Sequence, residues 1–238
     1  MDAENELAVD TITRTETERA GLQPRSLLLQ DWPRVLAILI GVCIATAVSV
    51  AWVDLPLAKF ILGKLGSGPT QFVVQAQYPD LLDVFVAIVT VCSWVAYVIL
   101  RRHHTGTRFV CWLQVIGTAV PLSYTAKDLL KAVFGRVNTR YWINHPYHFE
   151  FRWLQASDQF FGFPSGHLAV VGAILFAIMH YYPRAKSWCW AAMLLFGAAL
   201  IVSEYHFLGD VIAGGYVGWL AFAAARELPG TVPSSRSS

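Results

Sequence analysis

The stretch FFGFPSGHLAVVGAI, residues 160–174, places a serine, a glycine and a histidine directly before a run of apolar residues. Pro164 cannot continue a preceding helix and Ser165 is a favourable N-cap residue, so PSGH is predicted to form the first turn of a helix. The free backbone amides of such a turn bind anions, and Gly166 lets a bound group approach closely. An ordinary helix start is the alternative. His167 favours a binding site, because placing an ionisable imidazole near membrane depth is energetically unfavourable and such residues are usually functional.

The composition of the whole chain indicates where this helix lies. Of 238 residues, 55% are hydrophobic and only 14% are charged, which is too apolar for a soluble domain of this length. Uncharged stretches occupy residues 35–53, 84–100, 109–126, 168–182, 188–203 and 211–225. A membrane-spanning helix needs about 20 residues, and the flanks of each stretch can contribute a few. The sequence therefore predicts an all-α polytopic membrane bundle of about six transmembrane helices.

The two ends of the chain are predicted to lie outside this bundle. Residues 1–33 are polar, of mixed charge, and lack the basic start and apolar core of a cleavable signal, so we expect a flexible cytoplasmic tail. Residues 227–238 are likewise expected to form a flexible cytoplasmic tail. No internal repeat or long linker divides the intervening sequence, so residues 34–226 are expected to form one membrane domain.

The distribution of Lys and Arg predicts the orientation of the bundle. Beginning with the N-terminal tail, alternate segments between the predicted spans carry arginine, which places both termini in the cytoplasm. The segment 127–153 is an exception, because on the predicted outer side it carries Lys127, Lys131, Arg136, Arg140 and Arg152. Cations are normally scarce on that side, so an anionic ligand is the simplest explanation.

A second polar cluster lies in SEYHFLGDVIAGGYVGWL, residues 203–220. If a helix begins near His206, this ring and Asp210 lie four residues apart on one face, where the carboxylate can hold the imidazole. Such a carboxylate fixes the tautomer and makes the second ring nitrogen a better nucleophile. The alternative is a histidine that is merely capped by a nearby acid at the membrane interface. Gly214 and Gly218 further predict close helix packing, so this last helix is expected to be buried in the bundle.

Basic residues at the end of the third predicted span form a third cluster, KDLLKAVFGRVNTR, residues 127–140. Lys127 and Lys131 share a helix face, and Arg136 and Arg140 follow in the predicted loop. Lysines at helix ends usually extend to the membrane interface, which is the expectation for Lys127. Lys131 is the better candidate ligand because the two arginines follow it so closely.

Together these three clusters resemble the type 2 phosphatidic acid phosphatase superfamily, the membrane relatives of vanadium haloperoxidases. The resemblance rests on Lys131 near the end of the third span, PSGH at the start of the fourth and His-x-x-x-Asp at the start of the sixth, and it covers residues 109–225. It implies that His206 attacks phosphorus to form a phosphohistidine while Asp210 orients the ring. It also implies that His167 protonates the leaving oxygen and then activates the water that releases phosphate.

The resemblance also implies how the charge of the substrate is held. Lys131 and the backbone amides around Ser165 and Gly166 would bind the phosphoryl oxygens, a role that requires neither a metal ion nor another cofactor. The implied partners are a lipid phosphate substrate and the surrounding membrane lipids, with no nucleic acid.

This chain departs from the family pattern at two arginines. The first block of the family reads Lys, six residues, Arg-Pro, and here Asn138 and Thr139 stand at the Arg-Pro positions. The third block has an arginine six positions before its histidine, where this chain has Leu200. A lost charge-assisted phosphate contact costs about 1.5–3 kcal/mol. We therefore predict that Arg136, Arg140 or both bind phosphate in their place.

The function expected from these patterns is hydrolysis of a lipid phosphomonoester or pyrophosphate, at the extracytoplasmic face of a bacterial inner membrane. Phosphatidic acid, phosphatidylglycerol phosphate, a polyprenyl diphosphate and phosphorylated lipid A are all candidate substrates. A lipid phosphotransferase is the alternative within enzymes. A non-catalytic protein that binds or transports lipid phosphates is the alternative outside enzymes, favoured by the missing arginines and opposed by the histidines.

Overall fold

The computed structural model describes residues 32–65, 81–103, 106–145, 151–154 and 160–228. Within these ranges the regular structure is helical, apart from one isolated antiparallel bridge between Arg136 and Phe151. The prediction of an all-α bundle is therefore confirmed. The expected tails, residues 1–33 and 227–238, fall outside the described residues except at 32–33 and 227–228.

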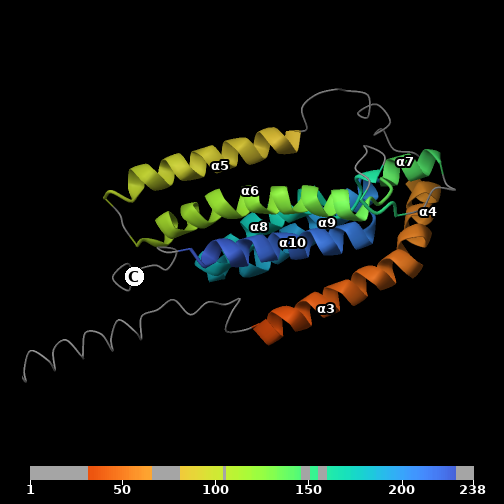
Figure 1. The fold of residues 1–238 in the computed structure, drawn as a ribbon, viewed down its shortest axis with the longest axis horizontal. Helices are drawn as coiled ribbons and strands as arrows, with labels where there is room; N and C mark the ends of the chain where they lie inside the picture. Colours follow the sequence, from red (N-terminus) through yellow and green to blue (C-terminus); the bar gives the residue numbers. More distant parts are fainter. Residues whose placement is uncertain (1–31, 66–80, 104–105, 146–150, 155–159, 229–238) are drawn as a thin grey trace, which may run out of the picture.

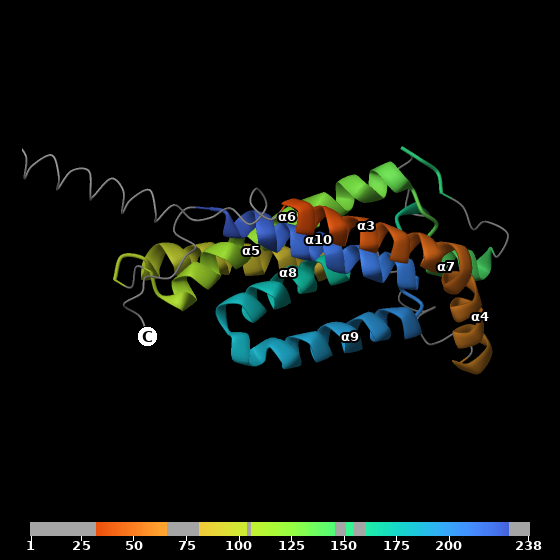
Figure 2. The same ribbon diagram turned by 90° about the horizontal axis from the view of Figure 1, so that it is seen from below.

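Figures 1 and 2 show how the described helices are arranged. In chain order they are α3 (Trp32–Val48), the π-helical turn η1 (Ser49–Val53), α4 (Asp54–Leu65), α5 (Leu81–Leu100), α6 (Arg108–Phe134), α7 (Thr139–Asn144), α8 (Gly166–Tyr181), the 3₁₀ turn η4 (Pro183–Ala185), α9 (Lys186–Val202) and α10 (Leu208–Arg226).

Five helical segments are long and apolar enough to cross a membrane: Trp32–Lys64, Leu81–Leu100, Arg108–Phe134, Pro183–Val202 and Leu208–Arg226. The fourth predicted span corresponds to α8, which is apolar but has only 16 residues, fewer than the roughly 20 that cross a bilayer unaided. The first segment is longer than predicted, because the helix does not end at the polar residues. It passes through η1 and continues as α4, which begins with Asp54.

Helices α6, α8 and α10 form the centre of the bundle, where each packs against the other two. Helix α5 packs against α6 and helix α3 against α10, so these two flank the centre on opposite sides (Figure 1). Helix α9 packs along α8 (Figure 2). The outer helices expose large apolar side chains, such as Leu194 and Leu195 of α9, which are 71% and 72% exposed. Apolar surface of this kind is suited to contact with lipid, and the chain is a membrane protein.

Glycines let α8 and α10 approach until their backbones touch. A Cβ atom on Gly214 would lie 2.4 Å from the carbonyl oxygen of Ser165, and one on Gly218 would lie 2.5 Å from that of Ala169. The predicted close packing of the last helix is therefore confirmed. The contact fixes the start of α8 against the start of α10, where the Ser165 amide donates to the Asp210 carbonyl at 2.9 Å.

Candidate active site

The three polar clusters of the sequence meet at one end of the bundle. The C-terminal end of α6 and the N-terminal ends of α8 and α10 lie there, together with α4 and α7 (Figure 1). Ser165 is the N-cap of α8, as predicted, and its hydroxyl accepts from the Leu168 amide at 3.4 Å. Ser165 and Gly166 are both buried. This helix end therefore presents backbone amides inside the bundle, where little water competes for them.

Two histidines, one in helix α8 and one in the loop before α10, lie close together at this end. His167 lies in the first turn of α8 and His206 two residues before α10, and their ring centroids are 6.1 Å apart. Tyr205 completes the group, with its ring centroid 5.1 Å from His167 and 5.8 Å from His206. His206 is buried, whereas His167 is partly exposed. The pair therefore combines a buried ring with a partly exposed one.

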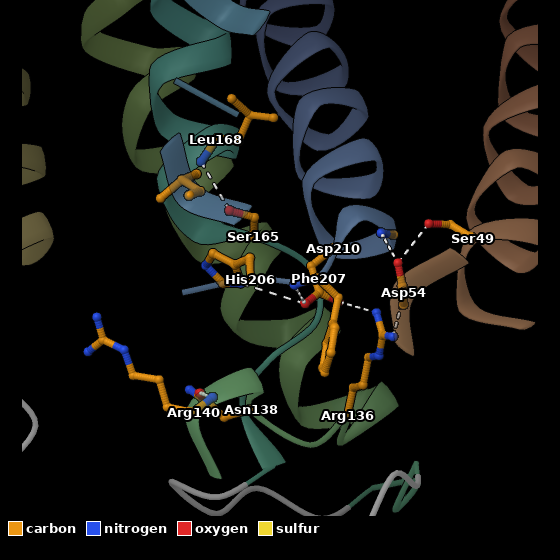
Figure 3. A network of polar contacts seen from close by, with 12 residues as sticks. Ser49, Asp54, Arg136, Asn138, Arg140, Ser165, Leu168, His206, Phe207 and Asp210 are labelled. Atoms are coloured by element: carbon orange, nitrogen blue, oxygen red, sulfur yellow. Dashed lines mark hydrogen bonds and ion pairs between the residues drawn. The ribbon is translucent and has the colours of Figure 1, made fainter. Parts of the chain in front are cut away.

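The Asp210 carboxylate stands beside His206, as the four-residue spacing predicts. Its Oδ2 atom lies 3.7 Å from His206 Nδ1 and accepts a hydrogen bond from the Phe207 amide at 3.0 Å (Figure 3). His206 Nδ1 is buried and has no hydrogen-bond partner among the described residues. A small movement of the ring would bring Nδ1–H into hydrogen-bonding distance of the carboxylate and leave Nε2 as the nucleophilic nitrogen.

Arg136 forms a buried ion-pair cluster instead of facing the histidines. Its Nη1 donates to Asp210 Oδ1 at 2.5 Å and its Nη2 donates to Asp54 Oδ2 at 2.5 Å (Figure 3). All three side chains are essentially inaccessible, at 0% exposure for Arg136 and Asp210 and 1% for Asp54. Both terminal nitrogens of Arg136 are thus bound to carboxylates. The structure thus places Arg136 against two carboxylates, and the expectation that it binds phosphate stays a prediction.

Arg140 points to the other side of the cluster (Figure 3). Its guanidinium carbon lies 4.0 Å from the centroid of the Tyr205 ring, the same ring that packs against His167. Asn138, which replaces the family arginine, is the N-cap of α7, and its Oδ1 accepts from the Arg140 amide at 3.0 Å. Asn138 therefore begins the short helix that carries Arg140. Of the two predicted replacements, Arg140 is the one that packs on the tyrosine ring beside both histidines.

The two lysines of α6 lie on the PSGH side of the site. Lys131 is partly buried, with Nζ 5.4 Å from the centroid of Phe161. The stem of Lys127 packs so closely on Gly166 that a Cβ there would lie 2.9 Å from its Cδ. Lys127 is 5% exposed and pairs with Asp128 at 2.7 Å, so its ammonium does not extend outward as expected.

Leu200 occupies the other position where the family has an arginine. Its side chain is buried in an apolar cluster with Leu168, Met193 and Val211. Its carbonyl oxygen accepts from the amides of Tyr205 and His206, at 2.9 and 3.2 Å. The backbone of Leu200 therefore helps to shape the loop that carries His206, and its side chain contributes no charge.

A small, mostly apolar pocket adjoins His206 between α4, α7 and the loop before α10. It is lined by Asp54, Leu57, Ala58, Ile61, Thr139, Ile143, Ile201, Glu204, His206, Phe207 and Leu208. Burial raises the pKa of Glu204 above its ordinary value, and the positive charge of Arg140 partly opposes this shift. Within the described ranges, no group of three or more His, Cys, Asp or Glu residues is arranged to hold a metal ion.

Sequence reasoning missed two residues of this arrangement. Asp54 follows the apolar stretch 35–53, and its partner Arg136 lies 82 residues further along the chain. Tyr205 had only its position beside His206 to single it out. Aromatic residues are common near membrane interfaces, so Tyr205 did not stand out. Asp54 did not stand out because its partner is so distant in the sequence.

Comparisons with known proteins show the family of the chain. The model of the PAP2 superfamily matches residues 109–232, which include His167, His206 and Asp210. A lipid A 1-phosphatase of Rhizobium etli is 31% identical over 127 residues, covering 52% of this chain and 54% of the relative. A lipid A 1-phosphatase of Rhizobium johnstonii is 29% identical over 127 residues, covering 52% and 51%.

The chain thus spans about half the length of these curated relatives. No solved structure matches the chain significantly. The family match nevertheless extends over more than half of the sequence and contains the whole PSGH turn and the His-x-x-x-Asp pair. The chain belongs to the PAP2 superfamily.

Proposed function

We propose that this protein is a lipid phosphatase that works through a phosphohistidine on His206. The observation that carries the proposal is the pairing of His206 with His167, at 6.1 Å between ring centroids, beside a buried carboxylate 3.7 Å from His206 Nδ1. This arrangement offers a nucleophile, an acid and an orienting group at one end of the bundle.

In the first step, Nε2 of His206 attacks phosphorus and the bond between phosphorus and the lipid oxygen breaks. His167 donates its proton to that departing oxygen, so the lipid leaves as an alcohol, or as a monophosphate when the substrate is a diphosphate. The phosphorylated ring carries a positive charge with Nδ1 protonated, and the Asp210 carboxylate stabilises that charge.

In the second step, a water molecule attacks the phosphohistidine. His167, now neutral, takes a proton from the water as the new oxygen–phosphorus bond forms and the bond to Nε2 breaks. Inorganic phosphate leaves, and both histidines return to their starting protonation states. The same ring therefore acts first as an acid and then as a base.

Charge on the transferring phosphoryl group must be balanced where little water is present. We assign this role to Lys131, to Arg140 and to the amides of the PSGH turn around Ser165 and Gly166, which lie at the same end of the bundle. A helix end contributes only about half a positive charge, so side-chain cations are needed as well. The scheme uses no cofactor, because these groups supply the nucleophile, the acid and the counter-charge.

The proposed substrate is a lipid whose phosphate lies at the membrane surface. The relatives named lipid A 1-phosphatase favour a sugar 1-phosphate on a lipid over phosphatidic acid, phosphatidylglycerol phosphate or a polyprenyl diphosphate. We propose that the site faces the periplasm from a bacterial inner membrane and that both termini are cytoplasmic. The arginine distribution supports this orientation.

Phosphate release from these four lipid classes, measured with detergent-purified protein and EDTA present, tests the function. We expect His206→Ala to abolish release while vanadate still binds weakly, because other residues supply most anion contacts. Asp210→Asn should slow turnover about 10- to 100-fold, in line with about 1.5–3 kcal/mol for a charged contact. His103→Ala, in an exposed turn at the opposite end of the bundle, is the matched control.

Two other results would point to different functions. Transfer of the phosphoryl group to a second lipid without phosphate release would identify a phosphotransferase. A non-catalytic lipid-phosphate binding or transport protein is favoured by Asn138 and Leu200 at the arginine positions. Binding of the lipids without turnover, or unchanged turnover in His206→Ala, would contradict the proposed mechanism.

A further inference from the structure

We propose that Asp54 is a positioning residue for the nucleophile, acting through Arg136 on Asp210. This inference rests on the proposed function, in which Asp210 orients His206. Asp54 begins helix α4, more than 50 residues before the part of the chain that matches the PAP2 superfamily, residues 109–232. The first membrane segment thus contributes to the site, although the family motifs do not include it.

The carboxylate of Asp54 is fully engaged by three donors. Its Oδ1 accepts from Ser49 Oγ at 2.7 Å and from the Gly209 amide at 3.0 Å, and its Oδ2 accepts from Arg136 Nη2 at 2.5 Å. Ser49 lies in the π-helical turn before α4 and Gly209 in the first turn of α10. Asp54 therefore ties the bend in the first membrane segment to the start of the helix that carries Asp210.

The backbone of α10 is shaped to admit this contact. A Cβ atom on Gly209 would lie 3.0 Å from Asp54 Oδ2 and 3.4 Å from Arg136 Nη1, so a side chain there would press on both partners. A buried carboxylate is costly unless it is paired and hydrogen-bonded. Here the charge of Asp54 is paired, and its hydrogen bonds come from two separate elements besides Arg136.

The position of Arg136 between two carboxylates determines what Asp210 can do. Each terminal nitrogen of Arg136 binds a different carboxylate, and its hydrogen bond to Asp210 is made to Oδ1. Its Oδ2 is left for the Phe207 amide and for His206. Without Asp54, the guanidinium would be free to turn and bind both oxygens of Asp210, since arginine favours bidentate contact with a carboxylate. Oδ2 would then be withdrawn from His206.

The charges of the cluster support the same role. One guanidinium between two carboxylates leaves a single surplus negative charge beside His206, in a region from which water is excluded. The positive charge that develops on the ring when Nε2 bonds to phosphorus is balanced by that surplus. An Arg136–Asp210 pair alone would be neutral and would offer the ring less stabilisation. Asp54 thus supplies the surplus negative charge of the cluster and fixes the contact between Arg136 and Asp210, without touching the substrate.

A double-mutant cycle distinguishes this role from a purely structural one. We expect Asp54→Asn to lower kcat about 10- to 100-fold, as for loss of one charged contact, with KM changed less than about two-fold. In an Asp210→Asn background, the same change should lower kcat less than about two-fold, because its effect passes through Asp210. Equal losses in both backgrounds, or full kcat in Asp54→Asn, would overturn the inference.

Further variants keep the test decisive if Asp54→Asn does not fold. Ser49→Ala removes one donor to Asp54 and leaves every charge, so we expect a smaller loss of kcat, again absent in the Asp210→Asn background. Glu227→Gln, a matched carboxylate-to-amide change at the other end of α10, should leave kcat unchanged.

Parallel assays of wild type and His206→Ala separate the two proposals. If turnover is absent or independent of His206, the proposed function and the role of Asp54 are both contradicted. If turnover depends on His206 but the effects of Asp54 and Asp210 are not coupled, only the role of Asp54 is contradicted.

Discussion

Arg136 and Arg140 lie four residues apart and have different electrostatic surroundings. The two carboxylates around Arg136 neutralise it, so it has no charge to spare for a substrate. Arg140 stacks on Tyr205, and its Nε is buried without a hydrogen-bond partner among the described residues. Stacking uses the face of a guanidinium and leaves its N–H edge for an anion. Arg140 is therefore the arginine we expect to bind phosphate.

Replacing Arg140 by alanine is predicted to lower kcat/KM about 10- to 100-fold, through loss of a charge-assisted contact worth about 1.5–3 kcal/mol. Lysine at the same position should restore activity only partly, because it lacks the planar fork. Arg152→Ala is the control, since Arg152 is exposed and stacks on Phe160. Full activity in Arg140→Ala would leave Lys127 as the next source of charge.

Glu204 is buried beside the pocket, and its backbone adopts a left-handed conformation with φ of 58°. Burial raises its pKa above the ordinary 4.5. An acid with a raised folded-state pKa stabilises the fold fully below its unfolded pKa, and this contribution is lost as the pH rises through the folded pKa. Ionised Glu204 therefore destabilises the protein at neutral and higher pH.

Glu204→Gln is predicted to raise the thermal unfolding temperature in detergent at pH 8 relative to wild type, because the amide carries no charge to desolvate. The difference should shrink as the pH falls toward 4.5, where wild-type Glu204 is protonated. Unfolding temperatures measured across this pH range provide the check. A pH-independent difference would mean that the charge of Glu204 is not its cause.

At the scale of helices, the glycine contact between α8 and α10 decides how the PSGH turn meets the His206 loop. Adjacent glycines of α10 differ sharply in this respect. A Cβ on Gly214 would lie 2.4 Å from the Ser165 carbonyl oxygen, whereas one on Gly215 would meet only the Leu168 side chain, at 3.6 Å. The first distance is a collision with backbone and the second is ordinary contact.

Gly214→Ala is therefore predicted to push the PSGH turn away from α10, destabilising the protein by about 1–3 kcal/mol, as overpacking does, and reducing turnover. Gly215→Ala should leave both properties close to wild type. Thermal unfolding and phosphate release for the two variants give a matched comparison. Equal behaviour would show that the α8–α10 contact can relax without disturbing the site.

For the whole molecule, the arrangement of the helices separates the site from the turn between α5 and α6. Asn144, at the end of α7, is exposed at the same end as the histidines, and His103 is exposed at the opposite end of the bundle (Figure 1). The two positions therefore report on opposite sides of the membrane in the proposed orientation.

Single cysteines at these positions test the topology in intact cells. A membrane-impermeant thiol reagent is expected to label Asn144→Cys from outside and to label His103→Cys only after permeabilisation. The background must lack the native cysteines, which are Cys43, Cys92, Cys111 and Cys189. The reverse labelling pattern would place the site in the cytoplasm and exclude lipids of the outer face as substrates.

Features that depend on neighbouring residues could be predicted without the structure. The start of α8 at Ser165 follows from Pro164 and a local cap, and the closeness of His206 and Asp210 follows from four-residue spacing. The helical class follows from long apolar stretches, because a span in lipid must satisfy its own backbone. Periodicity and caps act within a turn or two, so the sequence alone predicts them.

The surroundings of the two arginines became visible only in the folded chain. Arg136 reaches Asp210 and Asp54 across 74 and 82 residues of chain, and no local pattern links positions so far apart. Helical periodicity does not predict where the side chain of a loop arginine points. Arg136 and Arg140 were therefore equally good candidates for the phosphate contact on sequence alone. Packing of the first, third and last membrane helices brings Asp54 and Asp210 together, and the Arg136 side chain points to these two carboxylates. A buried guanidinium must lie where those charges are, because an unpaired one would be far too costly.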